Sequence, residues 1–557
     1  MNVSEALLDI LTDYGVKQIF GIPGDAINEL IEAIRKQDKI KFIHVLHEEA
    51  GAFAASVQAK ITGKLAVCVG TAGPGAIHLL NGLYDAKMDQ APVLAISGQV
   101  PTALAGTSYQ QEVNLNALFN DVTVFNQTVY NPEQMPGLAV LACQTALARK
   151  APAFLCIPVD ISSKNVPSYK KKKYSTYNLA KVIPDKGALE GAATLVDKSE
   201  RPCILAGIGA KGAADELIAV AEKIKAPIIK ALRGKDILAD DHPLTLGGIG
   251  LLGTEAAYKA MKNCDLLLIA GSDFPYPEFY PGNKVPVIQI DKESGKIGRR
   301  HPVETALVGE AKETLLELLP MLYEKANGDF LQKCREDMKR WTTEQEEKEM
   351  SRDTPIHPQA LARCISDHAQ NDAIIVCDTG AVTVWGARNF KIRGKQTFTL
   401  SGGLASMAIG MAGAIGAQLL YPGRQVIALC GDGGFSMLMA DFATAVKYKL
   451  NIKVFVFNNT KLEFIKMEEE ARSGNPESET DLPGIDFAWF ARSCGGAGYT
   501  LADPLQLDST VTDALASDKP AVIDVHVNPN EITWPPHITF GEALNFAKAK
   551  IEEVFSK

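Results

Sequence analysis

The chain has 557 residues, of which 46% are hydrophobic and 22% charged, with a formal net charge of −9. This length suits about three or four domains of ordinary folded composition, and the acidic balance disfavours a nucleic-acid-binding scaffold. No apolar run reaches the roughly 20 residues that span a bilayer. The first residues form an amphipathic pattern without signal-peptide character, so we expect a cytoplasmic protein.

The first part of the chain alternates strand and helix patterns. Ser4 is the expected N-cap of an opening helix that closes at Gly15. Short apolar runs then predict strands separated by helical patterns, which is typical of a parallel sheet covered on both faces; they span residues 18–20, 42–46, 65–69, 93–96 and 154–157.

Two further series of the same kind follow a polar segment. Residues 162–186 lack periodicity and contain the run Lys170 to Lys173, which indicates a surface linker. The second series has predicted strands at 203–207, 227–230, 265–271 and 287–291, and the third at 374–377, 425–430, 453–457 and 522–527. Residues 325–352 between them are charge-dense and predict an exposed helix.

The predicted fold class is therefore α/β, with three doubly wound parallel-sheet domains. The expected boundaries place domains at residues 1–165, 187–325 and 356–530, a linker at 166–186, a charged helical linker at 326–355 and a tail at 531–557.

The ten cysteines carry no motif. Cys68, Cys156, Cys377 and Cys430 lie inside apolar segments, and no two cysteines form a C-x-x-C pair. We expect buried, reduced thiols, with neither a zinc site nor a disulfide framework.

Each series contains a strand followed by glycines, at residues 70–75, 207–209 and 431–434. None of these turns continues into Lys-Ser or Lys-Thr, which disfavours a P-loop nucleotide site. Gly207-Ile208-Gly209 is interpreted as lacking the full dinucleotide fingerprint.

Asp432 and Asn459 indicate a metal-bound diphosphate. Asp432 follows the strand at 425–430, Asn459 follows the strand at 453–457, and a helical pattern over 436–450 joins them into a βαβ unit. Both side chains are thus expected at the carboxyl ends of neighbouring strands, where open α/β sheets bind ligands. Carboxylate and amide oxygens suit Mg²⁺, and glycines let a phosphate approach the backbone. An ordinary glycine-rich turn is the alternative.

Glu48 is the acidic residue of greatest interest in the first series. It follows the run 42–46 and is expected at a strand end or helix start. A buried carboxyl has a raised pKa and can hold a proton near neutral pH. The alternative is an acid that merely favours a helix N-terminus.

Together these motifs resemble a known family. Gly21 to Asp25, His47-Glu48-Glu49, Gly73-Pro74-Gly75, Gly431-Asp432-Gly433 and Asn459 are similar, in the same order, to the motifs of thiamine-diphosphate enzymes of the pyruvate oxidase and acetolactate synthase group. The resemblance covers nearly the whole chain. It implies a pyrimidine-binding domain, a middle domain and a diphosphate-binding domain.

The resemblance also implies roles for individual residues. Glu48 would bond N1′ of the aminopyrimidine; Asp432, Asn459 and the backbone carbonyl of Lys461 would ligate Mg²⁺; and Met407 would bend thiamine diphosphate into its V shape. Gln111, Phe464 and Glu468 match active-site positions. The remaining expected thiamine-diphosphate contacts are Pro23, Gly24, Gly73, Ala405, Ser406, Gly433, Gly434, Thr460 and Leu462.

The middle series resembles the FAD-binding domain of bacterial pyruvate oxidases and the quinone-reducing pyruvate dehydrogenase. Asp291 would bond a ribose hydroxyl, although an acid that simply begins a turn is the alternative. The other expected FAD contacts are Ile249, Gly250, Leu251, Leu252, Ser272, Asp273, Phe274, Pro275 and Tyr276.

The resemblance therefore implies a homodimer or homotetramer that oxidises pyruvate or a related 2-oxo acid. Acetate or acetyl phosphate would be the product, and a quinone or oxygen the electron acceptor. One alternative is acetolactate synthase-like carboligation with a structural FAD, although the tryptophan of that group is absent after Asn459. Another is a catalytically weak family member that acts through assembly.

Three features qualify this hypothesis. Gln110 replaces a phenylalanine that usually lines the substrate pocket, and Glu463 stands where a glycine is usual and could exclude a glycine-only backbone conformation. The C-terminal pattern over 540–557 has an apolar stripe that we expect to pack on its own domain, namely Leu544, Ala547, Ile551 and Val554. The resemblance implies a longer membrane-binding tail in the quinone-reducing relatives, so we expect peripheral membrane contact at most.

Overall fold

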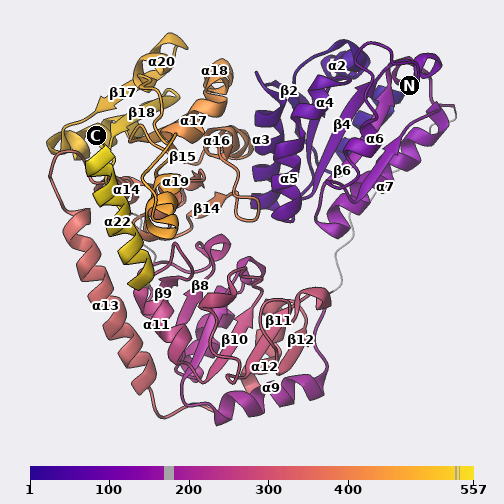
Figure 1. Ribbon diagram of the computed structural model, residues 1–557. Coiled ribbons are helices and arrows are strands. Elements are labelled where there is room, and N and C mark those ends of the chain that lie inside the picture. Colours follow the sequence, from indigo (N-terminus) through magenta and orange to yellow (C-terminus); the bar gives the residue numbers. More distant parts are fainter. Residues whose placement is uncertain (168–180, 533–535, 538–539, 557) are drawn as a thin grey trace.

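The computed structural model describes residues 1–167, 181–532, 536–537 and 540–556. It has three lobes, each built on a six-stranded parallel sheet with helices on its faces (Figure 1). The predicted fold class is confirmed. The run Lys170 to Lys173 lies outside the described residues.

The first lobe has strand order β2-β1-β3-β4-β6-β5, and every pair is parallel. The strands are β1 (Gln18–Gly21), β2 (Lys41–His44), β3 (Ala66–Gly70), β4 (Val93–Gln99), β5 (Phe125–Thr128) and β6 (Ala153–Pro158). The helices are α1 (Val3–Asp13), α2 (Asn28–Arg35), α3 (Glu48–Thr62), α4 (Pro74–His78), α5 (Leu80–Met88), α6 (Leu115–Leu118), α7 (Met135–Arg149) and α8 (Val159–Ser162).

The third lobe repeats this order as β14-β13-β15-β16-β18-β17. Its strands are β13 (Ile374–Cys377), β14 (Thr397–Leu400), β15 (Val426–Gly431), β16 (Ile452–Asn458), β17 (Ala497–Leu501) and β18 (Ala521–His526). Its helices are α14 (Pro358–His368), α15 (Ala381–Arg388), α16 (Ile409–Leu420), α17 (Asp432–Leu438), α18 (Phe442–Lys447), α19 (Glu463–Met467), α20 (Phe487–Ser493) and α21 (Leu507–Ala516).

The middle lobe has a different order, β12-β11-β10-β7-β8-β9, in which the chain winds outward in both directions from β7 and β10. The strands are β7 (Pro202–Ala206), β8 (Ile228–Lys230), β9 (Thr245–Gly248), β10 (Leu266–Ala270), β11 (Val287–Asp291) and β12 (Thr305–Val308). The helices are α9 (Lys186–Lys198), α10 (Ala214–Lys223), α11 (Glu255–Asn263) and α12 (Ala311–Leu318), and α13 (Asp329–Glu349) leads to the third lobe as the expected charged helix.

Five strands were not predicted, and all five lie at sheet edges: β5, β9, β12, β14 and β17. Most of them are only partly buried; β5 and β12, for example, expose part of both faces. An edge strand can carry polar residues that a central strand cannot, so its sequence lacks a continuous apolar run.

Two helix starts differ from expectation. Asn2, rather than Ser4, caps α1: its side chain accepts from the backbone N–H of Glu5, whose side chain accepts from that of Asn2. Ser4 is buried within the helix and donates to Ser162 O. The helix predicted over 436–450 begins at Asp432 instead and is interrupted at Met439–Asp441. Asp441 accepts there from the backbone N–H groups of Leu46 and His47 in the first lobe.

The first and third lobes share a core where α3 packs against α16. Phe53 and Val57 of α3 are fully buried in it. A β-carbon at Gly416 would lie 2.3 Å from Ala54 O, so only glycine allows this close approach. Because Glu48 begins α3, this contact fixes the position of Glu48 against the third lobe.

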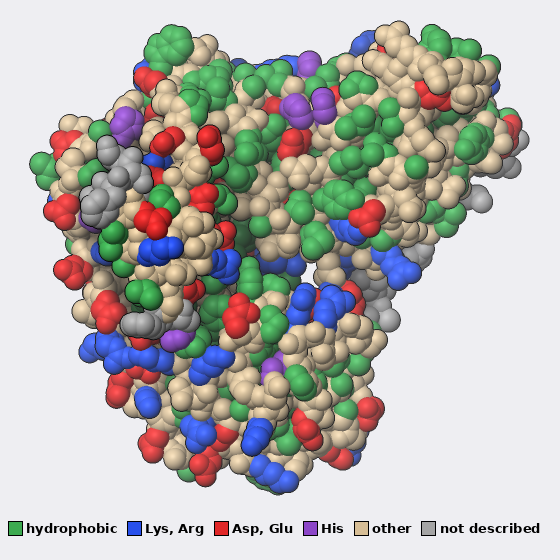
Figure 2. Space-filling view, in the orientation of Figure 1, with side chains coloured by type: hydrophobic (Ala, Val, Ile, Leu, Met, Phe, Trp, Pro, Cys, Tyr) green, Lys and Arg blue, Asp and Glu red, His purple; other side chains and the backbone are tan. Residues whose placement is uncertain are grey.

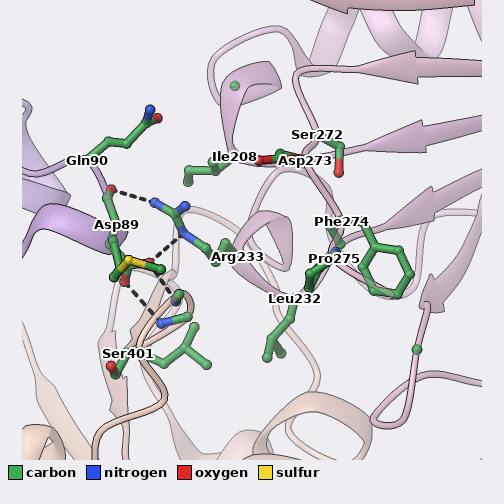
Figure 3. Close-up of a pocket in the computed structure, with 18 of the residues that line it drawn as sticks. Asp89, Gln90, Ile208, Leu232, Arg233, Ser272, Asp273, Phe274, Pro275 and Ser401 are labelled. Carbon is green, nitrogen blue, oxygen red and sulfur yellow. Dashed lines mark hydrogen bonds and ion pairs between the residues drawn. The ribbon is translucent and has the colours of Figure 1, made fainter. Parts of the chain in front are cut away.

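Asp89 joins all three lobes at one buried point (Figure 3). Its carboxylate pairs with Lys60 at 2.6 Å and with Arg233 of the middle lobe at 3.1 Å. It also accepts from the backbone N–H groups of Gly402 and Gly403 in the third lobe. Burial opposes the charge, but the two cations outweigh burial and lower the pKa of Asp89.

The C-terminal helix α22 (Phe540–Ser556) does not pack through its predicted stripe. Leu544 and Ile551 are 61% and 58% exposed, and the opposite face contacts the protein instead through Ala549, which is fully buried, and Lys550, which pairs with Glu470. The ion pair of Lys550 therefore helps to set the orientation of this helix.

The side chain of Val554 lies outside the described residues. In the part of the chain that is described, no helix has the length and apolar character needed to cross a membrane.

Asp89→Ala should lower the free energy of unfolding by about 1–3 kcal/mol, because the backbone N–H groups of Gly402 and Gly403 lose their acceptor and Lys60 keeps only Asp85 as a carboxylate partner. Denaturant midpoints measure this loss. Asp121→Ala is the control, since it removes an exposed carboxylate paired with Lys87 and should change the free energy of unfolding far less. Equal losses for the two variants would show that Asp89 does not hold the lobes together.

Candidate functional site

Asp432 and Asn459 lie together at the carboxyl ends of β15 and β16, as expected. Asp432 is the first residue of α17 and accepts from Thr460 N at 2.6 Å, directly beside Asn459. Both side chains are buried, and burial raises the pKa of Asp432 to about 6. No cationic side chain among the described residues pairs with Asp432, so this buried carboxylate is a suitable ligand for a divalent cation, which would stabilise its charge.

Glu463 holds the amide of Asn459. Asn459 Nδ2 donates to Glu463 Oε2 at 2.6 Å, while Asn459 Oδ1 accepts from Lys461 N at 3.0 Å. The N–H of Lys461 faces the oxygen of the Asn459 side-chain amide, and the carboxyl oxygen of Glu463 faces its nitrogen. These two contacts determine which way the amide group of Asn459 points. Burial raises the pKa of Glu463 to about 8, and its Oε1 has no partner among the described residues. Glu463 begins α19 without a left-handed backbone, so this position does not require glycine.

Apolar side chains converge over Gly433. A β-carbon there would lie 3.2 Å from Leu462 Cδ2 and 3.3 Å from Met407 Cε. Met407, the predicted wedge, thus lies beside the predicted metal ligands. Ala405 adopts a left-handed backbone, and Ser406 N donates to Ser401 Oγ, which shapes the loop that carries Met407. The Lys461 side chain is occupied by Glu477 and Asp481, so Lys461 can contribute only its backbone.

Asp378 was not identified from the sequence. It follows β13, is fully buried, and lies so close to Gly434 that a β-carbon there would be 2.4 Å from Asp378 Oδ2. Burial raises the pKa of Asp378 to about 7. Gly434 is therefore a packing requirement as well as a possible phosphate contact.

The first lobe contributes a second group around Glu48. Glu48 is buried at the start of α3, and its Oε2 lies 2.9 Å from His78 Nδ1. Its Oε1 lies over Gly75, where a β-carbon would be 3.0 Å away. His78 was missed because it is thirty residues away in sequence; it also stacks on His47.

Three turns of the first lobe carry further predicted site residues, namely Pro23, Gly24, Gly73 and Gln111. Gly24 faces Thr71, and Gly73 faces the backbone oxygen of Gln111, with too little space at either glycine for a β-carbon. The turns with Gly24 and Gly73 follow β1 and β3, the neighbouring strands between which the winding of the sheet reverses, and the turn with Gln111 follows β4. Gln111 is exposed and left-handed. No hydrogen bond or ion pair among the described residues joins Glu48 to Asp432 or Asn459.

A cavity of about 1280 Å³ lies where the three lobes meet, and the surface is visibly hollowed there (Figure 2). Every residue predicted to contact FAD lines it, from Ile249 to Leu252, from Ser272 to Tyr276, and Asp291. Ser272, Asp273 and Phe274 lie across it from Asp89 and Gln90 (Figure 3). Its volume exceeds the roughly 300–1,000 Å³ of common ligand pockets.

The middle sheet presents glycine backbone to this cavity. Its order corresponds to the 3-2-1-4-5-6 order of dinucleotide-binding sheets, with the switch point between β7 and β10. Gly207 and Gly209 follow β7 and lie against Gly271, where β-carbons would clash. The fingerprint was wrongly interpreted as incomplete, because Gly212 completes G-x-G-x-x-G. The next strand ends at Lys230 rather than at an acid.

Asp291 ends β11 and borders the cavity. Its Oδ1 accepts from Glu293 N, and burial raises the pKa of Asp291. Asp273 is instead paired with Arg299 and Arg300.

Phe464 and Glu468 reach the same cavity from the third lobe. Glu468 begins a π-helical turn, Glu468–Ser473, and pairs with Arg472. Such turns often occur at functional sites. Gln110 is exposed.

Three family descriptions match the chain in order. They are the thiamine pyrophosphate enzyme N-terminal TPP binding domain at residues 1–118, the central domain at 189–318 and the C-terminal TPP binding domain at 378–525.

Curated relatives match over almost the full length. YdaP of Bacillus subtilis, whose name describes a thiamine pyrophosphate-containing protein, is 43% identical over 100% of this chain and 96% of its own. The pyruvate oxidase of Lactiplantibacillus plantarum is 34% identical over 93% and 87%. The probable acetolactate synthase large subunit of Methanocaldococcus jannaschii is 33% identical over 95% and 93%.

Glu463→Ala should weaken Mg²⁺ binding about 10–100-fold, because Asn459 Nδ2 loses the acceptor that orients the amide. Glu463→Gln keeps an acceptor oxygen and should bind Mg²⁺ almost as the unaltered protein does. Calorimetric titration of Mg²⁺ in the presence of thiamine diphosphate measures both affinities. An alanine variant with unchanged affinity would contradict this role.

Proposed function

Because this chain belongs to the thiamine pyrophosphate enzyme family, we propose that it oxidatively decarboxylates pyruvate or a related 2-oxo acid with the help of FAD. The observation that carries the proposal is the cavity at the switch point of a dinucleotide-type sheet, which also reaches Phe464 and Glu468. The similarity to a pyruvate oxidase supports it.

When bound, thiamine diphosphate supplies the nucleophilic carbon and electron sink for decarboxylation, and FAD the oxidant. Asp432, Asn459 and the carbonyl of Lys461 would hold Mg²⁺ with phosphate oxygens. The backbone at Gly433 and Gly434 would face the diphosphate. The residues at this position fit the cofactor because they combine buried oxygen ligands with an apolar wall formed by Met407 and Leu462.

Glu48 would hold and exchange a proton with the aminopyrimidine through Oε1, because His78 occupies Oε2. His78 is thus a positioning residue. Among the described residues, no hydrogen bond or ion pair joins Glu48 to Asp432 or Asn459 of the same chain, which favours an assembly in which Glu48 of one subunit faces Asp432 of another. A homodimer or homotetramer follows from this proposal.

The glycine turns at 207–209 and 271 would admit the FAD diphosphate, and Asp291 would accept from a ribose hydroxyl. Phe464 and Glu468 would exclude water and contact substrate where the cavity enters the third lobe. Gln111 would border the substrate from the first lobe.

Acetolactate synthase-like carboligation is the second candidate, favoured by the 33% identity to such a subunit. FAD would then be structural. The products decide between the two candidates: pyruvate turnover with phosphate, oxygen and a quinone analogue should give acetate or acetyl phosphate and a reduced acceptor. Acetolactate without acceptor reduction would replace the proposal, and tight cofactor binding without turnover would indicate a protein that acts through assembly.

Glu48→Gln should lower turnover about 10²–10⁴-fold, because the side chain keeps its shape and loses its proton. Flavin content and unfolding temperature should not change. Glu49→Gln is the matched control, since it retains an oxygen for Asn81 and should keep its turnover. Similar turnover in the Glu48 variant and the control would assign the proton transfer elsewhere.

A further inference from the structure

Cys364, His368 and Asp508 lie together on the third lobe and outside the cavity lining. Cys364 and His368 are separated by one helical turn of α14, so they share a face. Asp508 lies in the first turn of the neighbouring helix α21. Their potential ligand atoms lie within 4.8 Å of one another.

The imidazole has a defined tautomer. His368 Nδ1 lies 2.9 Å from Cys364 O, which can only accept, so Nδ1 carries the hydrogen. The lone pair of Nε2 is then available, and Nε2 lies 3.6 Å from Asp508 Oδ1. A hydrogen bond from the second ring nitrogen to a carbonyl is the usual support of a metal-binding histidine.

The distances suit a tetrahedral centre. Metal–ligand bonds of about 2.0–2.3 Å place neighbouring ligands about 3.3–3.8 Å apart. The present separations are 3.6 Å from His368 Nε2 to Asp508 Oδ1 and 4.0 Å from Cys364 Sγ to Asp508 Oδ1. Cys364 Sγ lies 3.8 Å from His368 Nδ1, so the thiol must turn from Nδ1 toward Nε2 for both residues to bind one ion.

Asp508 is the only acidic residue in the cluster. The nearby Asp367 is already neutralised by Arg363 and Arg393. A metal ion would stabilise the thiolate and offset the charge of Asp508.

We propose that Cys364, His368 and Asp508 bind a thiophilic divalent cation of the Zn²⁺ class, with water as the fourth ligand, and thereby connect α14 to α21. Thiolate and imidazole select such an ion over Mg²⁺, which takes oxygen ligands. The site is therefore distinct in place and in chemistry from Asp432 and Asn459. The sequence predicted no zinc site because it has no C-x-x-C pair. The proposed ligands are instead far apart in sequence, with Cys364 and Asp508 separated by 144 positions.

Co²⁺ titration of chelator-treated, full-length protein tests the proposal. Thiamine diphosphate and excess Mg²⁺ occupy the catalytic site, where the proposed ligands are oxygens and give no thiolate band. We expect one thiolate-to-cobalt charge-transfer band per chain in difference spectra, and its loss on addition of Zn²⁺.

Cys364→Ser should abolish the band, whereas Cys494→Ser, at the other partly exposed cysteine, should retain it. His368→Gln and Asp508→Asn should each weaken Co²⁺ at least about tenfold. Circular dichroism confirms that each variant is folded. The absence of a band in the unaltered protein, or binding that is insensitive to His368 and Asp508, would overturn the proposal.

Discussion

The carboxylate of Asp89 is the point on which the arrangement of the three lobes depends. It pairs with Lys60 and Arg233 and accepts from two backbone N–H groups of the third lobe. Buried charges of this kind are costly unless every partner is present, so they specify one arrangement more than they add stability. The central cavity borders Asp89 and exists only while the lobes keep this arrangement.

The two outer lobes use one topology for complementary tasks. Their sheets have the same strand order, and in each a turn that we propose to bind cofactor follows a strand at the switch point. In the first lobe these are the turns after β1 and β3, near Glu48; in the third lobe it is the turn with Asp432 after β15, and Asn459 follows the next strand, β16. The shared core of α3 and α16 holds the lobes side by side, and the middle lobe adds a sheet of dinucleotide type.

The sequence predicted the central strands well because buried parallel strands are continuous apolar runs. It missed five of the six edge strands, whose exposed faces permit polar residues, and the capping role of Asn2. It placed Asp432 beside Asn459 correctly, because strand ends in a βαβ unit are local. His78, Asp378 and Asp89 were missed because their partners are distant in sequence. The charge of Glu463 was noticed, but its contact with Asn459 requires the fold.

The central claim is that electrons from decarboxylation at the thiamine site reach a flavin in the cavity. Anaerobic addition of pyruvate to the purified protein, with Mg²⁺ and thiamine diphosphate, measures this directly through the visible flavin absorbance. The account predicts a yellow protein that bleaches with pyruvate and recovers its colour when an acceptor is admitted. A protein without bound flavin, or a flavin that stays oxidised while pyruvate is consumed, would contradict it.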